Sequence, residues 1–340
     1  MTDRPRRPTA VLAMWPGFDP PLLTGEELDR LGKVVELADR EPLTEFQSER
    51  AAVLLGRAKV IVGHWGCPTL DAAALDLSPG LEMFAYAAGT LKEYKVVTDA
   101  VWERGILVTT GAAANAEPVA EYTIAAILFA NKDVFNTRER YRGAEATFSW
   151  PQRGPVGNYD KQVGLVGASR IGRRVIELLE PFELGVAVYD PYLDVEEAAA
   201  LGVVKMELAE LLETSDVVSI HAPALPETHH LIGVEEISLL QDGATLINTA
   251  RGSLVDPSAL EAELLTGRIS AVLDVTDPEP MPADSPLHRM PNVFLTPHIA
   301  GSQGSEYRRM AAMVIDEVAR FTRGEPPLHP VRRDEVERMA

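Results

Sequence analysis

The sequence predicts an α/β protein with two doubly wound parallel sheets, and three observations support this fold class. Short apolar runs of strand length alternate with longer amphipathic patterns of helix length along most of the chain. Such alternation is typical of parallel sheets covered by helices on both faces. A strand, a glycine turn, a helix and a second strand follow one another from residue 163, and a length of 340 residues favours two domains.

The composition is that of an ordinary globular protein, with 46% hydrophobic and 24% charged residues. The net charge of −19 disfavours nucleic acid and anionic membranes as partners, and a solubilising surface is the simpler interpretation. No apolar run approaches the roughly 20 residues of a membrane-spanning helix, and the N-terminus has no secretory core, so we expect a cytoplasmic protein. The single cysteine, Cys67, excludes an internal disulfide and a multi-cysteine metal site, and we expect no metal.

The first hundred residues predict one sheet, without a phosphate-binding fingerprint of its own. The apolar runs expected to form its strands are residues 11–14, 34–37, 60–62, 83–85 and 106–108. The patterns expected to form the intervening helices are residues 24–31, 44–57, 70–75 and 98–104.

The rest of the chain predicts a long helix, a loop and a second sheet. Residues 117–140 have a helical pattern with Pro118 at its second position, where a helix start tolerates proline. Residues 143–158 are rich in proline and glycine and predict a loop. Further elements follow in order: strands at 216–220, 244–247, 269–273 and 293–295, a helix at 256–265 between the second and third of these, and a last helix at 304–321.

The second sheet opens with half of a dinucleotide-binding unit at residues 163–190. Gly167 makes the tight turn after the first strand, and Gly172 lets the helix at 170–179 pack closely on that strand. The free N–H groups at the start of this helix favour a pyrophosphate. Asp190, which lies 190 − 172 = 18 residues beyond Gly172, is placed to accept a hydrogen bond from a ribose 2′-hydroxyl and would repel a 2′-phosphate. This predicts NAD rather than NADP.

One position departs from the dinucleotide fingerprint. Where the middle glycine lets the backbone approach the pyrophosphate, this chain has Ser169, which we expect to weaken cofactor binding. The alternative interpretation of the whole segment is a glycine turn in an α/β protein of another function.

Ionisable residues follow three of the strands predicted for the second sheet. Arg251 comes after strand 244–247, Asp274 and Glu279 come after strand 269–273, and His298 comes after strand 293–295. Ligands of doubly wound sheets bind beyond the carboxyl ends of the strands, so these side chains are expected at one edge. Taken singly, Arg251 fits a surface salt bridge, Glu279 a solvated loop acid and His298 a capping or core histidine.

Five segments in this order resemble the D-isomer-specific 2-hydroxyacid dehydrogenases. They are VGLVGASRIG, HAPALPETHHLIG, INTARGSLVD, LDVTDPEP and TPHIAG, and the resemblance extends from about residue 89 to 309. It implies a Rossmann NAD-binding domain at residues 116–321. This domain is inserted into a discontinuous, flavodoxin-like substrate domain of residues 1–115 and 322–340. The resemblance also implies a homodimer joined through the cofactor domains, with residues 143–150 in an arm near the interface.

The resemblance also implies a role for each reacting residue. Arg251 binds the carboxylate of a small 2-oxoacid or 2-hydroxyacid, because its planar fork matches a carboxylate bidentately. His298 is the general acid of reduction and the general base of oxidation, and Glu279 holds its other ring nitrogen. Asp274 accepts a hydrogen bond from the nicotinamide carboxamide. The residues expected to bind the cofactor are Gly167, Ser169, Arg170, Ile171, Gly172, Asp190, His221, Ala222, Pro223, Thr228, Thr249, Ala250 and Asp274.

The first domain departs from the family where the substrate binds. The family loop Arg-x-Gly-x-Gly-x-Asp corresponds to AAGTLKE here, with Ala87 in place of the arginine. We expect Ala88 and Gly89 of this loop to contact substrate through the backbone. Trp65, in the segment GHWGCP, is either a wall of the substrate site or a core residue. Tyr122 stands where the family often has histidine.

Two other function classes remain open. The same fold serves NAD-sensing corepressors without enzymatic activity, and relatives oxidise phosphite or formate. Formate-oxidising members usually carry glutamine at the position of Glu279, which disfavours formate for this chain.

Overall fold

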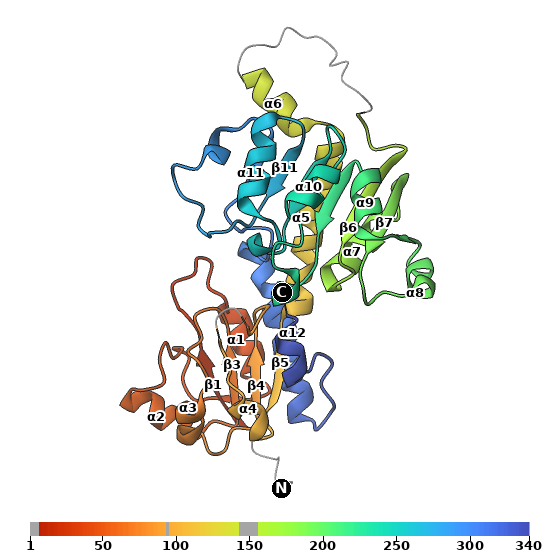
Figure 1. Cartoon of the computed structure of the whole chain (residues 1–340). Helices are drawn as coiled ribbons and strands as arrows, with labels where there is room; N and C mark the ends of the chain where they lie inside the picture. Colours follow the sequence, from red (N-terminus) through yellow and green to blue (C-terminus); the bar gives the residue numbers. More distant parts are fainter. Residues whose placement is uncertain (1–6, 93–94, 143–155, 340) are drawn as a thin grey trace. The chain divides into compact units, whose positions relative to one another are not determined.

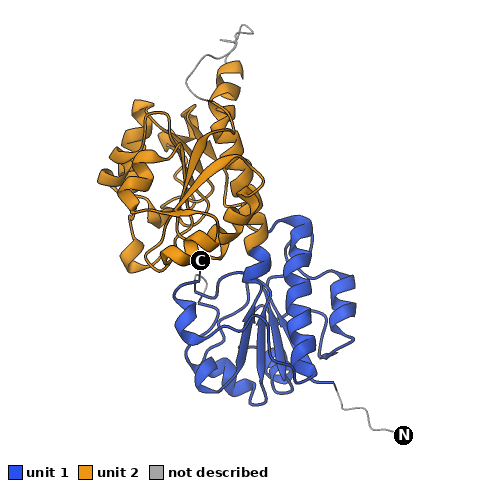
Figure 2. Ribbon diagram, turned by 90° about the vertical axis from the view of Figure 1, so that its right-hand side faces the viewer, with its two compact units in different colours: residues 1–115, 302–339 blue, residues 116–301, 340 orange. Residues whose placement is uncertain are grey.

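The computed structural model describes residues 7–92, 95–142 and 156–339, and it divides into two compact units. One unit combines Met1–Asn115 with Ser302–Met339, and the other is Ala116–Gly301, as Figure 2 shows. Each unit is built on its own parallel sheet.

The first unit contains a five-stranded sheet with the order β2-β1-β3-β4-β5, labelled in Figure 1. Its strands are β1 (Thr9–Ala13), β2 (Glu36–Leu37), β3 (Val60–Gly63), β4 (Met83–Tyr86) and β5 (Leu107–Thr110). Ala13, Gly63, Tyr86 and Thr110, which end β1, β3, β4 and β5, are paired in register. The turns that follow these four strands therefore start at one level.

Most of the helices in this unit that the sequence predicts are shorter than their patterns, whereas α3 is shifted by two residues at unchanged length. They are α1 (Gly25–Leu31), α2 (Glu49–Leu55), α3 (Ala72–Leu77), α4 (Ala100–Glu103), α12 (Tyr307–Thr322) and α13 (Arg333–Val336). Helix α2 was expected from residue 44, but Ser48 accepts a hydrogen bond from the Ala51 N–H and starts the helix there.

Helix α12 belongs to the first unit, which moves the expected domain boundary. We predicted that the cofactor domain extends to residue 321, whereas the chain returns to the first unit at Ser302. The reason is the apolar face of α12. Met310 and Val314 are buried in the same core cluster as Leu12 of β1.

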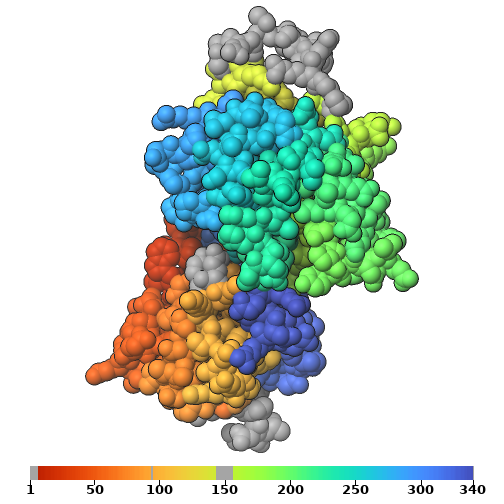
Figure 3. Space-filling view, in the orientation of Figure 1, coloured from red at the N-terminus to blue at the C-terminus, as the bar shows by residue number. Residues whose placement is uncertain are grey.

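The C-terminal segment is held on the first unit by hydrogen bonds. The Val331 N–H donates to the Val108 carbonyl over 2.8 Å, and the Trp102 indole donates to the Val331 carbonyl over 3.2 Å. Buried Glu317 accepts the backbone N–H groups of Leu328 and His329. In Figure 3 this last, blue part of the chain lies beside the orange surface around residue 100.

The second unit contains a seven-stranded sheet with the order β12-β11-β10-β9-β6-β7-β8, and every neighbouring pair is parallel. Its strands are β6 (Lys161–Val166), β7 (Leu184–Tyr189), β8 (Val204–Lys205), β9 (Val217–Ile220), β10 (Thr245–Asn248), β11 (Ser270–Leu273) and β12 (Val293–Leu295). Its helices are α5 (Ala112–Asn131), which begins in the first unit, α6 (Val134–Arg142), α7 (Arg170–Leu179), α8 (Val195–Ala200), α9 (Leu208–Thr214), α10 (Val234–Leu239) and α11 (Pro257–Thr266). The expected class of two parallel α/β sheets is confirmed.

The long helix predicted at residues 117–140 is wrong at both ends. Helix α5 begins at Ala112, because the alanine-rich residues before Pro118 are strong helix formers, and Pro118 lies inside the helix. It stops at Asn131, and Asp133 has a positive φ of 51° before α6 begins.

Residues 143–150, expected in an interface arm, lie outside the described residues. None of the helices in the described part of the chain combines the length and apolar content that crossing a bilayer requires.

Candidate active site

The carboxyl ends of six strands of the second unit are aligned. Pairing in register joins Tyr189, Val166, Ile220, Asn248, Leu273 and Leu295, which are the last residues of β7, β6, β9, β10, β11 and β12. The residues that come next in the chain therefore start at one level of the sheet. They are Asp190, Gly167, His221, Thr249, Asp274 and Thr296. All but the last of these were predicted to be cofactor residues.

Neither Gly167, in the turn after β6, nor Gly172, in the first turn of helix α7, has room for a side chain. Gly167 has a φ of +107°, and a Cβ atom there would lie 2.7 Å from the Ala222 nitrogen. A Cβ atom on Gly172 would lie 2.3 Å from the Gly167 carbonyl oxygen. The helix and the turn thus approach as closely as the dinucleotide fingerprint requires.

Ser169 is the N-cap of helix α7, which begins at Arg170 and continues through Ile171. Its extended backbone and its hydroxyl, which accepts the Gly172 N–H over 3.4 Å, stabilise the start of the helix. Because one side-chain oxygen takes only one of the first N–H groups, the helix start keeps donors for an anion. The residue that departs from the glycine fingerprint therefore has a structural task of its own.

Asp190 ties the end of β7 to the glycine turn. Its Oδ2 accepts the Ala168 N–H over 2.7 Å, and its Oδ1 accepts the Tyr192 N–H over 2.8 Å. The side chain is half-buried, and its charge lies beside the turn where the ribose of a dinucleotide is expected.

His221 lies beneath the glycine turn as a neutral, buried residue. It is 3% exposed, its backbone N–H donates to the Val166 carbonyl, and its Nε2 lies 3.0 Å from the Ser219 hydroxyl. Burial lowers the pKa of His221 to about 4, so the ring is neutral near pH 7. Its neighbours Ala222 and Pro223 continue into a loop that the Thr228 hydroxyl closes by donating to the Pro223 carbonyl over 2.6 Å.

The turn after β10 places Arg251 next to the strand end. The Thr249 hydroxyl is buried 3.0 Å from that of Thr123, and the Ala250 N–H donates to the Asn248 side chain. The same Asn248 side chain donates to the Arg251 carbonyl over 2.9 Å. The Arg251 backbone is thereby held at its carbonyl and through its neighbour Ala250. The residue is half-buried, and its guanidinium donates to the Ala250 carbonyl over 2.7 Å.

Asp274, after β11, organises the loop that follows β12. Its carboxylate is 2% exposed and accepts three hydrogen bonds, from the Thr296 hydroxyl at 2.6 Å and from the Ile299 and Ala300 N–H groups at 2.8 Å each. Its backbone carbonyl accepts the His298 N–H over 2.8 Å. These bonds hold His298 at a φ of +55°, a conformation uncommon for a residue with a side chain. Oδ2 retains acceptor capacity, so its predicted bond to nicotinamide stays a prediction.

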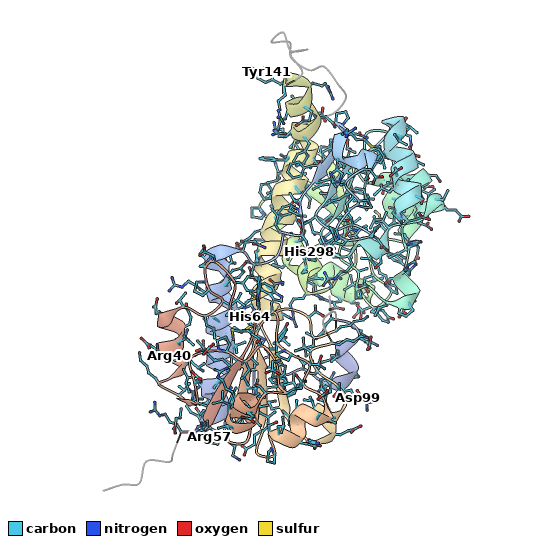
Figure 4. The ribbon with its side chains drawn as sticks, turned by 90° about the vertical axis from the view of Figure 1, so that its left-hand side faces the viewer. Arg40, Arg57, His64, Asp99, Tyr141 and His298 are labelled. Atoms are coloured by element: carbon cyan, nitrogen blue, oxygen red, sulfur yellow. The ribbon has the colours of Figure 1, made fainter. Side chains whose placement is uncertain are left out.

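His298 and Glu279 form a close pair. His298 Nδ1 lies 2.6 Å from Glu279 Oε1, and the two side chains are 37% and 40% exposed. The loop from Asp274 and the loop from β12 therefore bring together two of the three predicted catalytic residues. Figure 4 labels His298. With Nδ1 engaged by the carboxylate, Nε2 is the nitrogen left to exchange a proton with a ligand.

The sequence interpretation gave Tyr122 no role, although it contacts this network. Its hydroxyl lies 2.7 Å from Thr296 Oγ1. Since the single Thr296 proton goes to the Asp274 carboxylate, Tyr122 is the donor of the bond to Thr296. Partial burial raises the pKa of the Tyr122 hydroxyl above its ordinary value, and the Asp274 charge adds to this effect. Helix α5 thus supports the His298 loop, a contact over 174 residues that no sequence motif reveals.

The predicted substrate residues Trp65, Ala88 and Gly89 lie in the first unit. Trp65 follows β3 and is half-buried, whereas Ala88 is fully buried in the core after β4. The Ala88 carbonyl accepts the Gly111 N–H over 3.0 Å. A Cβ atom on Gly89 would lie 3.3 Å from the Asn115 amide nitrogen. The Ala88 side chain is therefore a core group.

The chain is similar in sequence and in fold to proteins of one family. The family model of the D-isomer specific 2-hydroxyacid dehydrogenase NAD-binding domain matches residues 124–300. The chain is 35% identical over 272 residues to the glyoxylate reductase of Korarchaeum cryptofilum, covering 78% of this chain and 81% of that protein. It is 33% identical over 292 residues to the D-3-phosphoglycerate dehydrogenase of Mycobacterium bovis, covering 86% of this chain.

The chain spans about half the length of that dehydrogenase, namely 53%. Among solved structures, a phosphoglycerate oxidoreductase from Rhizobium etli superimposes with a TM-score of 0.82 at 25% identity, covering 97% of this chain and all of that one.

Proposed function

Because this chain belongs to the D-isomer-specific 2-hydroxyacid dehydrogenase family, we propose that it interconverts a 2-oxoacid and a D-2-hydroxyacid with NAD. Residues 124–300 match the NAD-binding domain of the family. The observation that carries the proposal is the pair of His298 and Glu279, joined over 2.6 Å at the carboxyl edge of that domain's sheet.

The residues around the glycine turn fit a dinucleotide. Gly167 and Gly172 let the turn and the helix pack closely, the start of α7 offers N–H donors, and Asp190 supplies the acceptor for a ribose hydroxyl. When bound, the nicotinamide supplies or takes the hydride. His221, which is buried and neutral, packs against this turn.

The reacting groups then have distinct tasks. Arg251 holds the carboxylate of the substrate through its two-pronged guanidinium. In reduction, protonated His298 donates its Nε2 proton to the carbonyl oxygen that becomes the hydroxyl, and in oxidation neutral His298 takes that proton back. Glu279 fixes the ring by accepting from Nδ1. Asp274 and Thr296 hold the backbone on which His298 stands.

A panel of 2-oxoacids tests the proposal directly. Absorbance loss at the wavelength of reduced nicotinamide should follow addition of at least one small 2-oxoacid to enzyme with NADH. The product should be the D-2-hydroxyacid by chiral chromatography. Binding of NADH without turnover of any 2-oxoacid would instead favour an NAD-sensing protein, and turnover of phosphite or formate alone would favour another chemistry.

Asp190 should determine the choice between the two dinucleotides. Replacing it with asparagine keeps an acceptor oxygen for only one of the Ala168 and Tyr192 N–H groups, and it removes the charge that repels a 2′-phosphate. We expect the ratio of kcat/KM for NADH to that for NADPH to fall by about tenfold or more, since hydrogen bonds to charged groups contribute roughly 1.5–3 kcal/mol. An unchanged ratio in Asp190→Asn and Asp190→Ala would remove Asp190 from cofactor selection.

Glu279→Gln should lower kcat for reduction while NADH binding persists. Glutamine keeps a side-chain oxygen that can accept from His298 Nδ1, but the charge of the close pair is lost. The loss should be modest, about two- to fivefold, because both side chains are about 40% exposed and screened by water. Steady-state rates measure the loss of kcat, and fluorescence titration measures NADH binding. Equal kcat values for the variant and the wild type would make Glu279 a bystander.

A further inference from the structure

Five aromatic rings gather at one edge of the sheet in the first unit, and this inference rests on the proposed function. Trp15 and Phe18 follow β1, His64 and Trp65 follow β3, and Tyr307 begins α12. Ring centroids lie 5.0 Å apart for Trp15–Phe18, 5.9 Å for Phe18–Trp65, 5.7 Å for Trp65–Tyr307 and 4.8 Å for His64–Trp65. These are the separations of attractive aromatic pairs.

The outermost ring is fixed although it is exposed. Trp15 is 54% exposed, which is unusual for the residue type with the largest apolar surface. A Cβ atom on Gly66 would lie 2.4 Å from the Trp15 Cβ, and one on Gly17 would lie 2.7 Å from the Trp15 ring. The Trp15 N–H also donates to the Trp65 carbonyl over 2.9 Å. The two glycines thus make room for a tryptophan that stays open to a ligand.

His64 adds a neutral donor to this cluster and no charge. It is fully buried, and burial lowers its pKa to about 3. Its Nδ1 accepts the Trp65 N–H over 2.8 Å, so its proton is on Nε2. Within the described part of the chain this Nε2 has no hydrogen-bond partner, and a buried unpaired donor calls for an explanation. Figure 4 labels this histidine.

The residues that directly follow the strands at this edge include no lysine or arginine. This holds for residues 14–19, 63–68, 86–91 and 110–115, and Lys92, which comes directly after residue 91, donates to the Glu337 carbonyl. Ala87, at the position of the arginine in the family loop, is fully buried. Arginine and lysine side chains are the usual partners of a phosphate group, and these residues supply neither; the start of α5 at Ala112 offers backbone N–H groups only.

We infer that this edge binds the side chain of the substrate, and that the substrate is a 2-oxoacid with a bulky apolar side chain, aromatic or branched aliphatic, without a phosphate. Ligands of parallel α/β sheets bind beyond the carboxyl ends of the strands, which is where the rings lie. The aromatic rings at this edge would stabilise an apolar side chain by burying its surface. They would disfavour a doubly charged phosphate, because rings offer it neither positive charge nor hydrogen-bond donors.

The test compares phenylpyruvate and 4-methyl-2-oxopentanoate with glyoxylate and 3-phosphohydroxypyruvate, all with NADH. We expect kcat/KM for phenylpyruvate to exceed that for glyoxylate by at least about tenfold, since each extra buried methylene group is itself worth about that much in a fitted apolar pocket. Turnover of 3-phosphohydroxypyruvate should be the weakest of the four.

Variants of the aromatic cluster test whether these rings cause the preference for phenylpyruvate over glyoxylate. Trp65→Ala and Trp15→Ala should each lower the phenylpyruvate to glyoxylate ratio by about tenfold, with the loss mainly in KM. Trp15 is exposed, so its variant tests the inference even where Trp65→Ala fails to fold. Trp102→Ala is the matched control. This tryptophan of the same unit lies in helix α4, and its indole donates to the Val331 carbonyl, so its loss should leave the ratio unchanged.

The outcomes separate the inference from the proposed function. Preference for glyoxylate or 3-phosphohydroxypyruvate, or a ratio that neither tryptophan variant changes, would overturn the inference while the dehydrogenase function stands. Absence of turnover with every 2-oxoacid would overturn the proposed function, and the inference with it.

Discussion

Replacing His298 with glutamine should lower kcat for 2-oxoacid reduction by about 10²–10⁴, the usual contribution of a positioned general acid. Glutamine keeps a polar side chain at this position but cannot deliver a proton to the carbonyl oxygen. The backbone bonds from Asp274 to residues 298–300 do not involve the ring, so the loop should keep its conformation. The loss should appear in single-turnover rates, while the dissociation constant of NADH, measured by fluorescence, stays within about threefold of the wild type.

His288→Gln is the matched control for this experiment. His288 is an exposed histidine of the same unit, and its Nε2 lies 3.1 Å from the Pro282 carbonyl. The control should retain wild-type rates. A His298→Gln enzyme that reduces its best 2-oxoacid at more than about a third of the wild-type rate would remove His298 from proton transfer.

The fold was predictable because its local signals agree with one another. Each strand of the two sheets that pairs over three or more residues coincides with an apolar run read from the sequence. The signals failed where two of them compete. Pro118 resembles a helix start, yet the alanines before it extend α5 to Ala112, because helix propensity over several residues outweighs one missing hydrogen bond.

The candidate site was predictable as an ordered set of residues, and its supporting contacts were not. That Arg251, Asp274 and His298 follow successive strand ends can be read from the sequence. The Asp274 carboxylate also accepts hydrogen bonds from Thr296, Ile299 and Ala300. These bonds depend on how two loops fold back on each other, which the sequence does not reveal. The Tyr122 bond to Thr296 likewise joins positions 174 residues apart. A single sequence contains no local signal for such pairs.

Gly172→Ala should raise the dissociation constant of NADH by about five- to a hundredfold. The added methyl carbon would lie 2.3 Å from the Gly167 carbonyl oxygen, a backbone atom that can move only with the turn. Overpacking of this kind typically costs about 1–3 kcal/mol. The strain displaces the turn after β6, which is where the pyrophosphate is expected, so the loss should fall on cofactor binding. Fluorescence titration with NADH measures it.

Gly185→Ala separates this effect from a general loss of stability. Gly185 lies in β7 of the same sheet, and a Cβ atom there would be 3.7 Å from its nearest neighbour, the Lys161 carbonyl, which is an ordinary contact. This control should bind NADH as the wild type does. Thermal unfolding gives the second readout, because NADH at a fixed excess stabilises the protein by an amount that grows with the logarithm of its affinity. If Gly172→Ala unfolds at a lower temperature but gains as much stability from NADH as the wild type, the turn tolerates the methyl group. The close approach of α7 to β6 would then serve folding alone.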